Sequence, residues 1–204
     1  MTQEKKKKSY KGLIILGVVL LFVFLLISSA TRTYNGLVKA EETVDAQWAQ
    51  VENTYQRRAD LIPNLVSTVK GYADFEQKTL TDVIEARSKA TSVNINPENI
   101  NPQSLQQFQA AQDGLSSALS RLMVVVERYP ELKANQNFLE LQSQLEGTEN
   151  RISVERRRFN ETATTYNTNI RSFPRNLFAS IFGFERKAYF EASEGAEKAP
   201  VVNF

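Results

Sequence analysis

The chain of 204 residues contains no cysteine and no histidine. It therefore lacks the commonest general base, the usual zinc ligands and a thiolate nucleophile, and it cannot form disulfide bonds. The sequence also shows no Ser-His-Asp, HExxH, phosphate-loop or glycine-rich nucleotide motif. We predict no catalytic residues, no metal, no cofactor and no small-molecule substrate. An enzyme that uses carboxylates alone remains as a lesser alternative.

An excess of basic residues is found only at the N-terminus. Lys5, Lys6, Lys7, Lys8 and Lys11 precede the first apolar run, whereas residues 31–204 carry 20 basic and 22 acidic side chains. A domain with this balance presents no basic face for nucleic acid, so we predict no nucleic-acid partner. The lysines instead indicate membrane topology and contact with anionic lipid.

Residues 12–29 form an uncharged apolar run, GLIILGVVLLFVFLLISS. As a helix this run is about 27 Å long, close to the hydrocarbon thickness of a bilayer. We predict a transmembrane helix over residues 12–30 and, from the lysines, a short basic cytoplasmic N-terminus over residues 1–11. A cleaved signal peptide is the alternative, because Ser28-Ser29-Ala30 loosely fits a cleavage site, although the run exceeds the usual ~7–15 residues.

The remainder of the chain has the apolar periodicity of helices, with an average spacing of about 3.5 residues. Prolines and asparagines interrupt the pattern at residues 94–102, 129–131 and 173–174. We predict an all-α fold in which the transmembrane helix precedes an elongated antiparallel up-and-down bundle of about four helices, over residues 31–192. The predicted helices are 34–70, 74–93, 103–129 and 134–171, followed by a short aromatic segment, 175–190, and a flexible tail, 193–204.

The topology depends on the stretch around Gly71. Lys70-Gly71 resembles a helix stop, and Asp74 with Gln77 resembles a capping box. The apolar stripe of the preceding helix nevertheless continues across this stretch with nearly the same helical phase. If the chain reverses here, four antiparallel helices result, which is the interpretation we favour. If it continues, one helix over residues 34–93 is about 90 Å long, and another subunit has to cover its membrane-proximal half.

One segment breaks the local rules of a helix. Heptad counting places Arg58 and Glu76 at core positions, where a charge needs a partner. Pro63 lies inside the helical pattern, at a cost of roughly 3 kcal/mol. The segment is either a kink with a polar layer that fixes helix register, or a docking site for another chain. Its candidate residues are Arg57, Arg58, Asp60, Pro63 and Asn64, and the acidic residues that could pair with it are Glu127, Glu149 and Glu155.

Residues 173–190, FPRNLFASIFGFERKAYF, are rich in aromatic side chains interleaved with basic ones. This segment either lies at a membrane interface, caps the open end of the bundle or packs against a neighbouring subunit. Its candidate residues are Phe173, Phe178, Phe182, Phe184, Tyr189 and Phe190. Trp48, Tyr55 and Phe182 are candidate partner contacts if the monomer leaves them exposed.

Residues 34–76, YNGLVKAEETVDAQWAQVENTYQRRADLIPNLVSTVKGYADFE, resemble the LemA family. Residues 127–134 (ERYPELKA), 145–152 (LEGTENRI) and 157–160 (RRFN) agree with it, as do Tyr166-Asn167 and Phe173-Pro174, so the resemblance spans Tyr34 to about Ala192. It implies an N-terminal transmembrane helix followed by an antiparallel helical bundle, and it implies no activity. Some descriptions of the family place the short N-terminus outside the cell, whereas the lysines here favour the cytoplasm.

Together these features predict a non-enzymatic envelope scaffold or interaction module in the bacterial cytoplasmic (inner) membrane, with the bundle on the extracytoplasmic or periplasmic side. Its expected partners are the lipid bilayer, further copies of itself and other envelope proteins, because anchoring confines copies to two dimensions. The alternative is an envelope sensing or signalling adaptor. Since residues 1–11 are too few for an output domain, such an adaptor has to work through a separate membrane partner.

Overall fold

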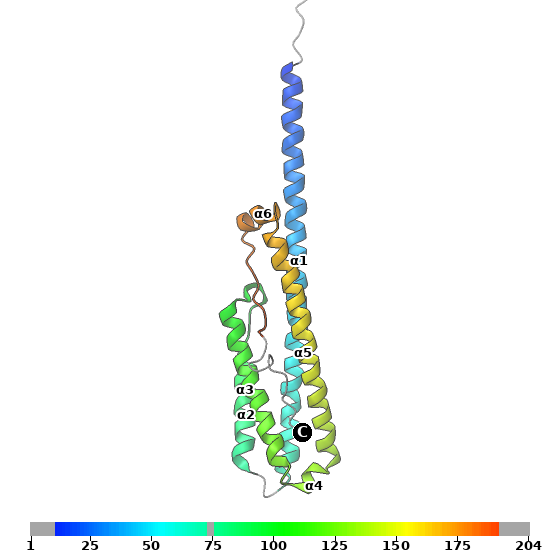
Figure 1. Cartoon of the computed structure of the whole chain (residues 1–204), viewed down its shortest axis with the longest axis vertical. Helices are drawn as coiled ribbons and strands as arrows, with labels where there is room; N and C mark the ends of the chain where they lie inside the picture. The colour runs from blue at the N-terminus through cyan, green and yellow to red at the C-terminus, as the bar shows by residue number, and fades with distance from the viewer. Residues whose placement is uncertain (1–10, 73–75, 192–204) are drawn as a thin grey trace, which may run out of the picture.

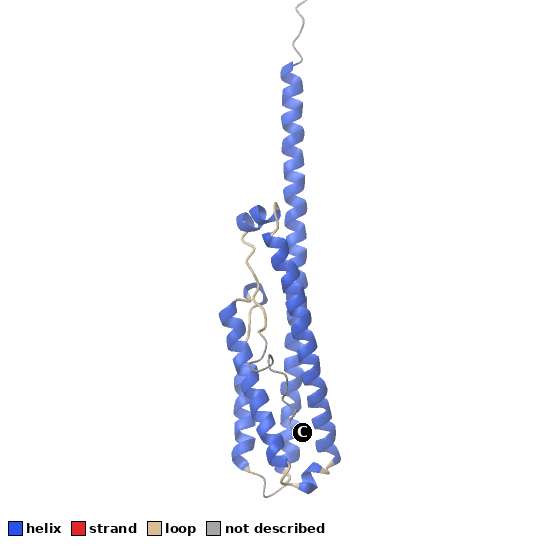
Figure 2. Cartoon of the chain, viewed as in Figure 1, coloured by secondary structure: helices blue, strands red, loops and turns tan. Residues whose placement is uncertain are grey.

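The computed structural model describes residues 11–72 and 76–191, and every regular element within these ranges is a helix (Figures 1 and 2). The prediction of an all-α fold is confirmed. Lys5 to Lys8, Asp74 and the predicted tail, 193–204, lie outside the described residues. The elements are α1 (Lys11–Lys70), α2 (Gln77–Ser92), η1 (Pro97–Asn99), α3 (Pro102–Val126), α4 (Pro130–Lys133), α5 (Gln136–Arg171) and α6 (Arg175–Phe182).

Helix α1 contains both the apolar run and the first helix of the bundle. Its 60 residues extend about 90 Å, and its N-terminal part projects alone beyond the bundle (Figure 1). The large apolar side chains of this part, from Leu13 to Ile27, are 44–68% exposed, whereas Leu37 is 1% exposed. The projecting part is long and apolar enough to cross a membrane. The predicted helices 12–30 and 34–70 are therefore one helix, because no glycine or proline separates them.

The chain reverses after α1. Helix α1 ends at Lys70, and α2 begins at Gln77 and runs back along the bundle (Figure 1). A single helix over residues 34–93 is therefore wrong. Gly71 suits the turn, because an added Cβ atom would lie 3.3 Å from the backbone oxygen of Thr68. The helical register does not extend past the turn, so Glu76 is exposed, instead of lying in the core as heptad counting predicted.

Helices α1 and α5 form a long pair, and α2 and α3 cover the half of this pair that is far from the apolar run (Figure 1).

Side-chain caps set the starts of two helices. Asn101 and Ser104 form a capping box on α3, and Asn135 Oδ1 accepts a hydrogen bond from Phe138 N at 3.1 Å at the start of α5. Helix α3 ends at Val126, before the predicted boundary at 129, because Pro130 begins the separate turn α4.

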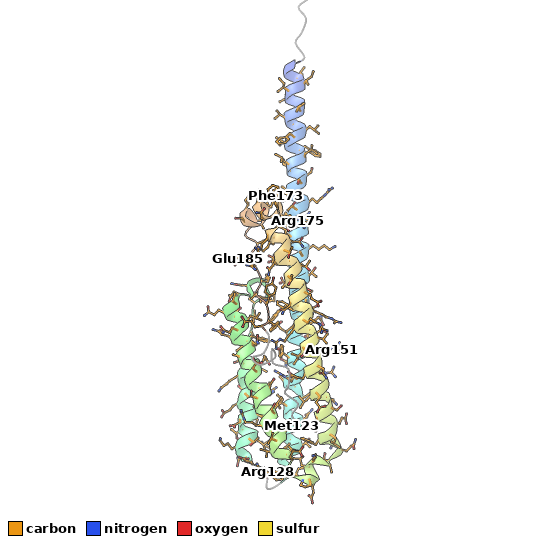
Figure 3. The ribbon with its side chains drawn as sticks, viewed as in Figure 1. Met123, Arg128, Arg151, Phe173, Arg175 and Glu185 are labelled. Atoms are coloured by element: carbon orange, nitrogen blue, oxygen red, sulfur yellow. The ribbon has the colours of Figure 1, made fainter. Side chains whose placement is uncertain are left out.

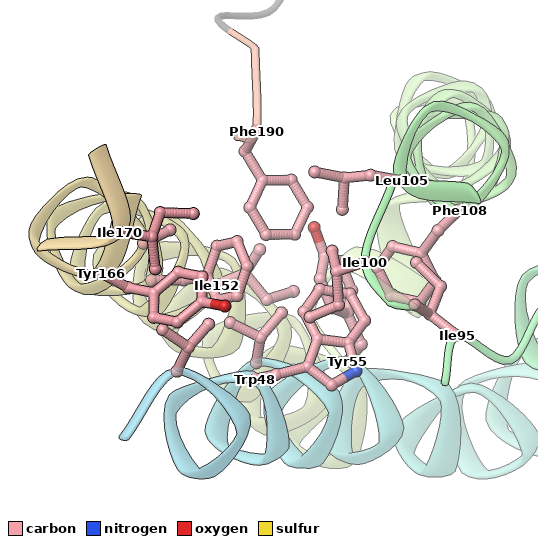
Figure 4. Packing of buried hydrophobic residues seen from close by; sticks show 14 of the residues in the cluster. Trp48, Tyr55, Ile95, Ile100, Leu105, Phe108, Ile152, Tyr166, Ile170 and Phe190 are labelled. Carbon is pink, nitrogen blue, oxygen red and sulfur yellow. The ribbon is translucent and has the colours of Figure 1, made fainter. Parts of the chain in front are cut away.

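The buried residues form two clusters, which we name by their distance from the apolar run. The distal core lies among α1, α2, α3 and the start of α5, around Leu65, Leu115 and Phe138. The proximal core is aromatic and centres on Trp48, whose ring centroid lies 5.5 Å from Phe159 and 5.9 Å from Phe190 (Figure 4). Because Trp48 and Tyr55 belong to this core, they are not the exposed partner contacts that the sequence allowed.

Candidate functional site

Arg58 connects three helices through a polar layer that is buried at Arg58 and reaches the surface at Glu149. Its guanidinium, 2% exposed on α1, donates from Nη1 to Glu149 Oε2 of α5 at 2.7 Å and to Ser116 Oγ of α3 at 2.8 Å. Its Nη2 donates to Gln112 Oε1 of α3 at 2.7 Å. Glu149 is thus the acidic candidate that pairs with Arg58. A charge on α1 that is held by groups from α3 and α5 has the contacts expected of a layer that fixes the axial register of three helices.

The other two acidic candidates have different partners. Glu127 forms an ion pair with Lys133. Glu155 accepts a hydrogen bond from Gln47 at 2.9 Å and pairs with Arg158 at 3.0 Å.

Pro63 lies inside α1, two turns before its C-terminal end, and faces outward. Because proline has no N–H, the carbonyl of Ala59, one turn earlier, loses its normal helical donor. Arg87 Nε from α2 donates to this buried carbonyl at 2.7 Å. The unusual backbone at Pro63 is therefore satisfied by a neighbouring helix of the same chain.

The remaining residues predicted for this segment, Arg57, Asp60 and Asn64, are exposed on α1. Asp60 Oδ1 accepts a hydrogen bond from Gln56 Nε2 at 2.7 Å. The structure thus divides the predicted set into a buried polar layer at Arg58 and an outward-facing strip. The contacts of Arg58 and Ala59 are those of a register-fixing layer, and they leave a docking site at this point without direct support.

Residues 184–191 run as an extended segment along the proximal core, held by two asparagines of α5. Asn167 Nδ2 donates to Lys187 O at 2.8 Å, and its Oδ1 accepts from Lys187 N at 3.0 Å. Asn160 forms the same pair of bonds with the backbone of Phe190, both at 2.9 Å. The asparagines lie seven residues apart and therefore share a face of α5. Each side-chain amide thus satisfies the backbone N–H and C=O of one residue of the extended segment, as a neighbouring strand does in a sheet.

Lys187 fastens this segment to the opposite side. Its side chain is 3% exposed, and its Nζ lies 3.0 Å from Glu41 Oε1 and 3.8 Å from Asp45 Oδ1 of α1. The same ammonium donates to the carbonyl of Pro97 in η1 at 3.1 Å. An ammonium with two carboxylates and a carbonyl around it is well compensated for its burial. Sequence reasoning missed this site, since no sequence pattern links Lys187 with Glu41 and Asp45.

The aromatic residues of the C-terminal segment occupy different environments. Helix α6 packs beside α1 at the end of the bundle from which the apolar run projects, with Phe182 4.9 Å and Phe184 5.9 Å from Tyr34 between ring centroids. Figure 3 shows Phe173 and Arg175 at this end. Phe190 is buried, Phe178 and Phe184 are half-buried, and Phe173, Phe182 and Tyr189 are exposed.

Burial shifts the pKa of two acidic groups of the bundle. Burial and the nearby Glu41 carboxylate raise the pKa of Tyr166, and burial raises the pKa of Glu52. Within residues 11–72 and 76–191, no three His, Cys, Asp or Glu side chains are grouped to hold a metal ion.

These features define a class: a helical-bundle protein whose first helix extends into a candidate membrane anchor. The chain belongs to the LemA family, whose sequence model matches residues 47–204. It is 27% identical to "Protein LemA" of Metamycoplasma hominis over 78% of this chain and 69% of that protein. It is also 27% identical to "Magnetosome protein MamQ 2" of Paramagnetospirillum magneticum over 94% of this chain and 75% of that protein. It is 25% identical to "Magnetosome protein MamQ" of Magnetospirillum gryphiswaldense over 99% of this chain and 81% of that protein.

Proposed function

We propose that the protein is a membrane-anchored, non-enzymatic scaffold or interaction module that holds its bundle at a fixed height above the bacterial cytoplasmic membrane. The observation that supports this proposal is the continuity of α1 from the apolar run to the far end of the bundle. Residues 31–70 of this helix extend about 60 Å. An unbroken helix packed against α5 is a stiff spacer, which suits a protein that positions partners rather than one that encloses a substrate.

The proposed orientation places residues 1–11 in the cytoplasm, following the five lysines. The absence of cysteine allows single reporters: Thr2→Cys and the exposed Val124→Cys. In intact cells with a permeabilised outer layer, a membrane-impermeant maleimide is expected to label position 124 and not position 2. The opposite pattern would reverse the orientation. A mature mass beginning at Thr31 would show a cleaved signal peptide instead of an anchor.

Self-assembly is part of the proposal, because anchored copies meet at high effective concentration in two dimensions. Donor and acceptor dyes on Val124→Cys, in full-length protein reconstituted into liposomes, measure it directly. Energy transfer above that of randomly placed copies at the same surface density is expected. Transfer that follows the random value at every density would contradict self-assembly and leave a monomeric interaction module.

The same continuity of α1 favours a second candidate function, an adaptor that carries a change in the bundle across the membrane. Thr33→Pro would interrupt the helix between anchor and bundle, with Thr33→Ala as the matched control. An adaptor would lose complementation of a deletion strain while it still copurifies with its bundle-side partner. A scaffold would keep both, because a break at residue 33 leaves intact the part of α1 that packs against α5 and spans the length of the bundle.

A further inference from the structure

Helix α6 lies at the level where α1 leaves the predicted membrane. Its Phe182 ring packs against Tyr34 at 4.9 Å, and Tyr34 follows Ala30, the end of the predicted span, by four residues. These four residues correspond to about 6 Å along the helix axis. The headgroup region on each side of a bilayer is roughly 5–8 Å deep. The contact with Tyr34 therefore places α6 at headgroup depth, beside the helix that anchors the chain (Figure 1).

One face of this helix is apolar and is left exposed by the part of the chain that the structure describes. On this face Leu177 is 56% exposed and Ile181, four residues later, is 74% exposed; Phe173, which precedes the helix, is 82% exposed. On a helix, Leu177 and Ile181 point within about 40° of each other, whereas the buried Ala179 lies about 200° from Leu177. Ala179 packs into the proximal core, so Leu177 and Ile181 point away from the bundle. A contiguous exposed patch of large apolar side chains marks an interaction surface.

The charges around this face suit the phosphates of lipid headgroups. Arg171 and Arg175 are exposed at its N-terminal side, and Arg32 is exposed on α1 just after the apolar run. Arg175 is also bonded to Asn169, which orients its guanidinium. Tyr34, which packs on α6, is 41% exposed, and tyrosine is enriched at this depth of membrane proteins. Arginines beside an apolar face are the pattern of a helix that lies in a membrane interface.

We propose that residues 173–182 form a second membrane contact, in which Phe173, Leu177 and Ile181 insert at the boundary between headgroups and acyl chains of the leaflet from which α1 emerges. This inference rests on the anchoring of α1 in the proposed function. Two contacts with one leaflet fix the direction of the bundle relative to the membrane. The protein then stands as an oriented pillar instead of swinging about the end of its transmembrane helix.

The experiment measures depth in the bilayer with an environment-sensitive dye on single cysteines, in the full-length chain reconstituted into liposomes of phosphatidylcholine and phosphatidylglycerol. The reporter is Ile181→Cys. Leu21→Cys reports the anchor, and Val124→Cys on α3 is the control far from the membrane. With nitroxides near the lipid headgroups, position 181 is expected to show a blue-shifted emission and a loss of fluorescence, while position 124 shows neither.

The possible outcomes distinguish failure of the α6 membrane contact from failure of the transmembrane anchor. Quenching at position 21 together with water-like, unquenched emission at position 181 would overturn the inference alone. Absence of quenching at position 21, with nitroxides along the acyl chain, would overturn the anchor as well. A blue-shifted but unquenched dye at position 181 would show that protein covers this face, which also overturns a lipid contact.

A substitution provides the second, independent test. Leu177→Ser in the Ile181→Cys protein removes part of the apolar face, so the quenching at position 181 is expected to fall. The matched control is Ile84→Ser on α2, which removes an apolar side chain of 45% exposure far from the membrane and is expected to leave the quenching unchanged. Equal quenching in both variants would contradict insertion through Leu177.

Discussion

The hydrogen bond from Arg87 to the carbonyl of Ala59 compensates for the N–H that Pro63 lacks, and its contribution to stability can be measured. In the native chain, Arg87→Met removes the donor and keeps most of the apolar stem, so the buried carbonyl of Ala59 loses the partner that replaces the missing proline N–H. In a chain that carries Pro63→Ala, the backbone N–H of residue 63 restores the normal helical bond. We therefore expect Arg87 to matter for stability only while residue 63 is proline.

The expected magnitudes follow from the groups involved. Loss of a hydrogen bond from a charged donor to a buried carbonyl costs about 1.5–3 kcal/mol, so Arg87→Met should lower the free energy of unfolding by that amount. In the Pro63→Ala background the same change should cost less than about 0.5 kcal/mol, as for a surface substitution. The coupling between the two positions is then about 1–2.5 kcal/mol. Pro63→Ala alone should stabilise by about 2–2.6 kcal/mol, because relief of the ~3 kcal/mol cost of a helical proline is offset by about 0.4–1 kcal/mol from a freer unfolded chain.

Chemical denaturation of the full-length protein in detergent micelles measures these values. Trp48 is the single tryptophan and lies in the proximal core, so its fluorescence follows unfolding, and circular dichroism checks for a two-state transition. Arg121→Met, at an exposed position on α3, is the matched control and should change stability by less than about 0.5 kcal/mol. If Arg87→Met costs the same with proline or alanine at position 63, the proposed compensation is wrong.

Further predictions concern the polar layer, the C-terminal segment and a buried tyrosine. Glu149→Ala should lower the free energy of unfolding by about 2–4 kcal/mol, because the guanidinium of Arg58 stays buried without its counter-charge. Arg58→Met in the same chain should recover most of this loss, as measured by chemical denaturation. If stability is not recovered, the loss does not come from the unpaired charge of Arg58. Asn160→Ala removes both bonds to the extended segment, so stability should fall by about 2 kcal/mol and the emission of Trp48 should shift to longer wavelengths, whereas an unchanged spectrum would show that the segment stays docked. Burial raises the pKa of Tyr166, so above about pH 10 the unfolded chain ionises first and stability falls as pH rises; Tyr166→Phe should flatten this fall, and an identical pH profile would refute it.

The helices could be predicted from the sequence because their apolar stripes are long and their ends carry proline or asparagine, as at Asn101 and Pro130. The buried charge of Arg58 was also predictable, since the stripe places it at a core position. The reversal at Gly71 remained a choice between alternatives, because the stripe continues in phase across it. Heptad counting beyond that turn then misplaced Glu76.

The docking of residues 184–191 could not be predicted by the same means. An extended segment has no helical periodicity, and the segment contains four charged side chains that suggest solvent. Its position depends on Asn160 and Asn167 of α5 and on Lys187, which reaches Glu41 only after the bundle has formed. A signal was present, since the two asparagines lie seven residues apart beside a buried apolar stripe, but spacing alone does not identify the backbone they bind.

The lengths of the helices explain why the core needs this segment. Helix α5, with 36 residues, is about 54 Å long, whereas α2, with 16 residues, is about 24 Å and α3, with 25, about 38 Å. The apolar stripe of α1 between Leu37 and Trp48 therefore lies largely beyond the reach of α2 and α3. Residues 184–191, extended over about 26 Å, cover it and place Phe190 against Trp48. The cover that a single helix over residues 34–93 would have required from another subunit thus comes from the same chain, and the described residues leave Leu177 and Ile181 of α6 exposed.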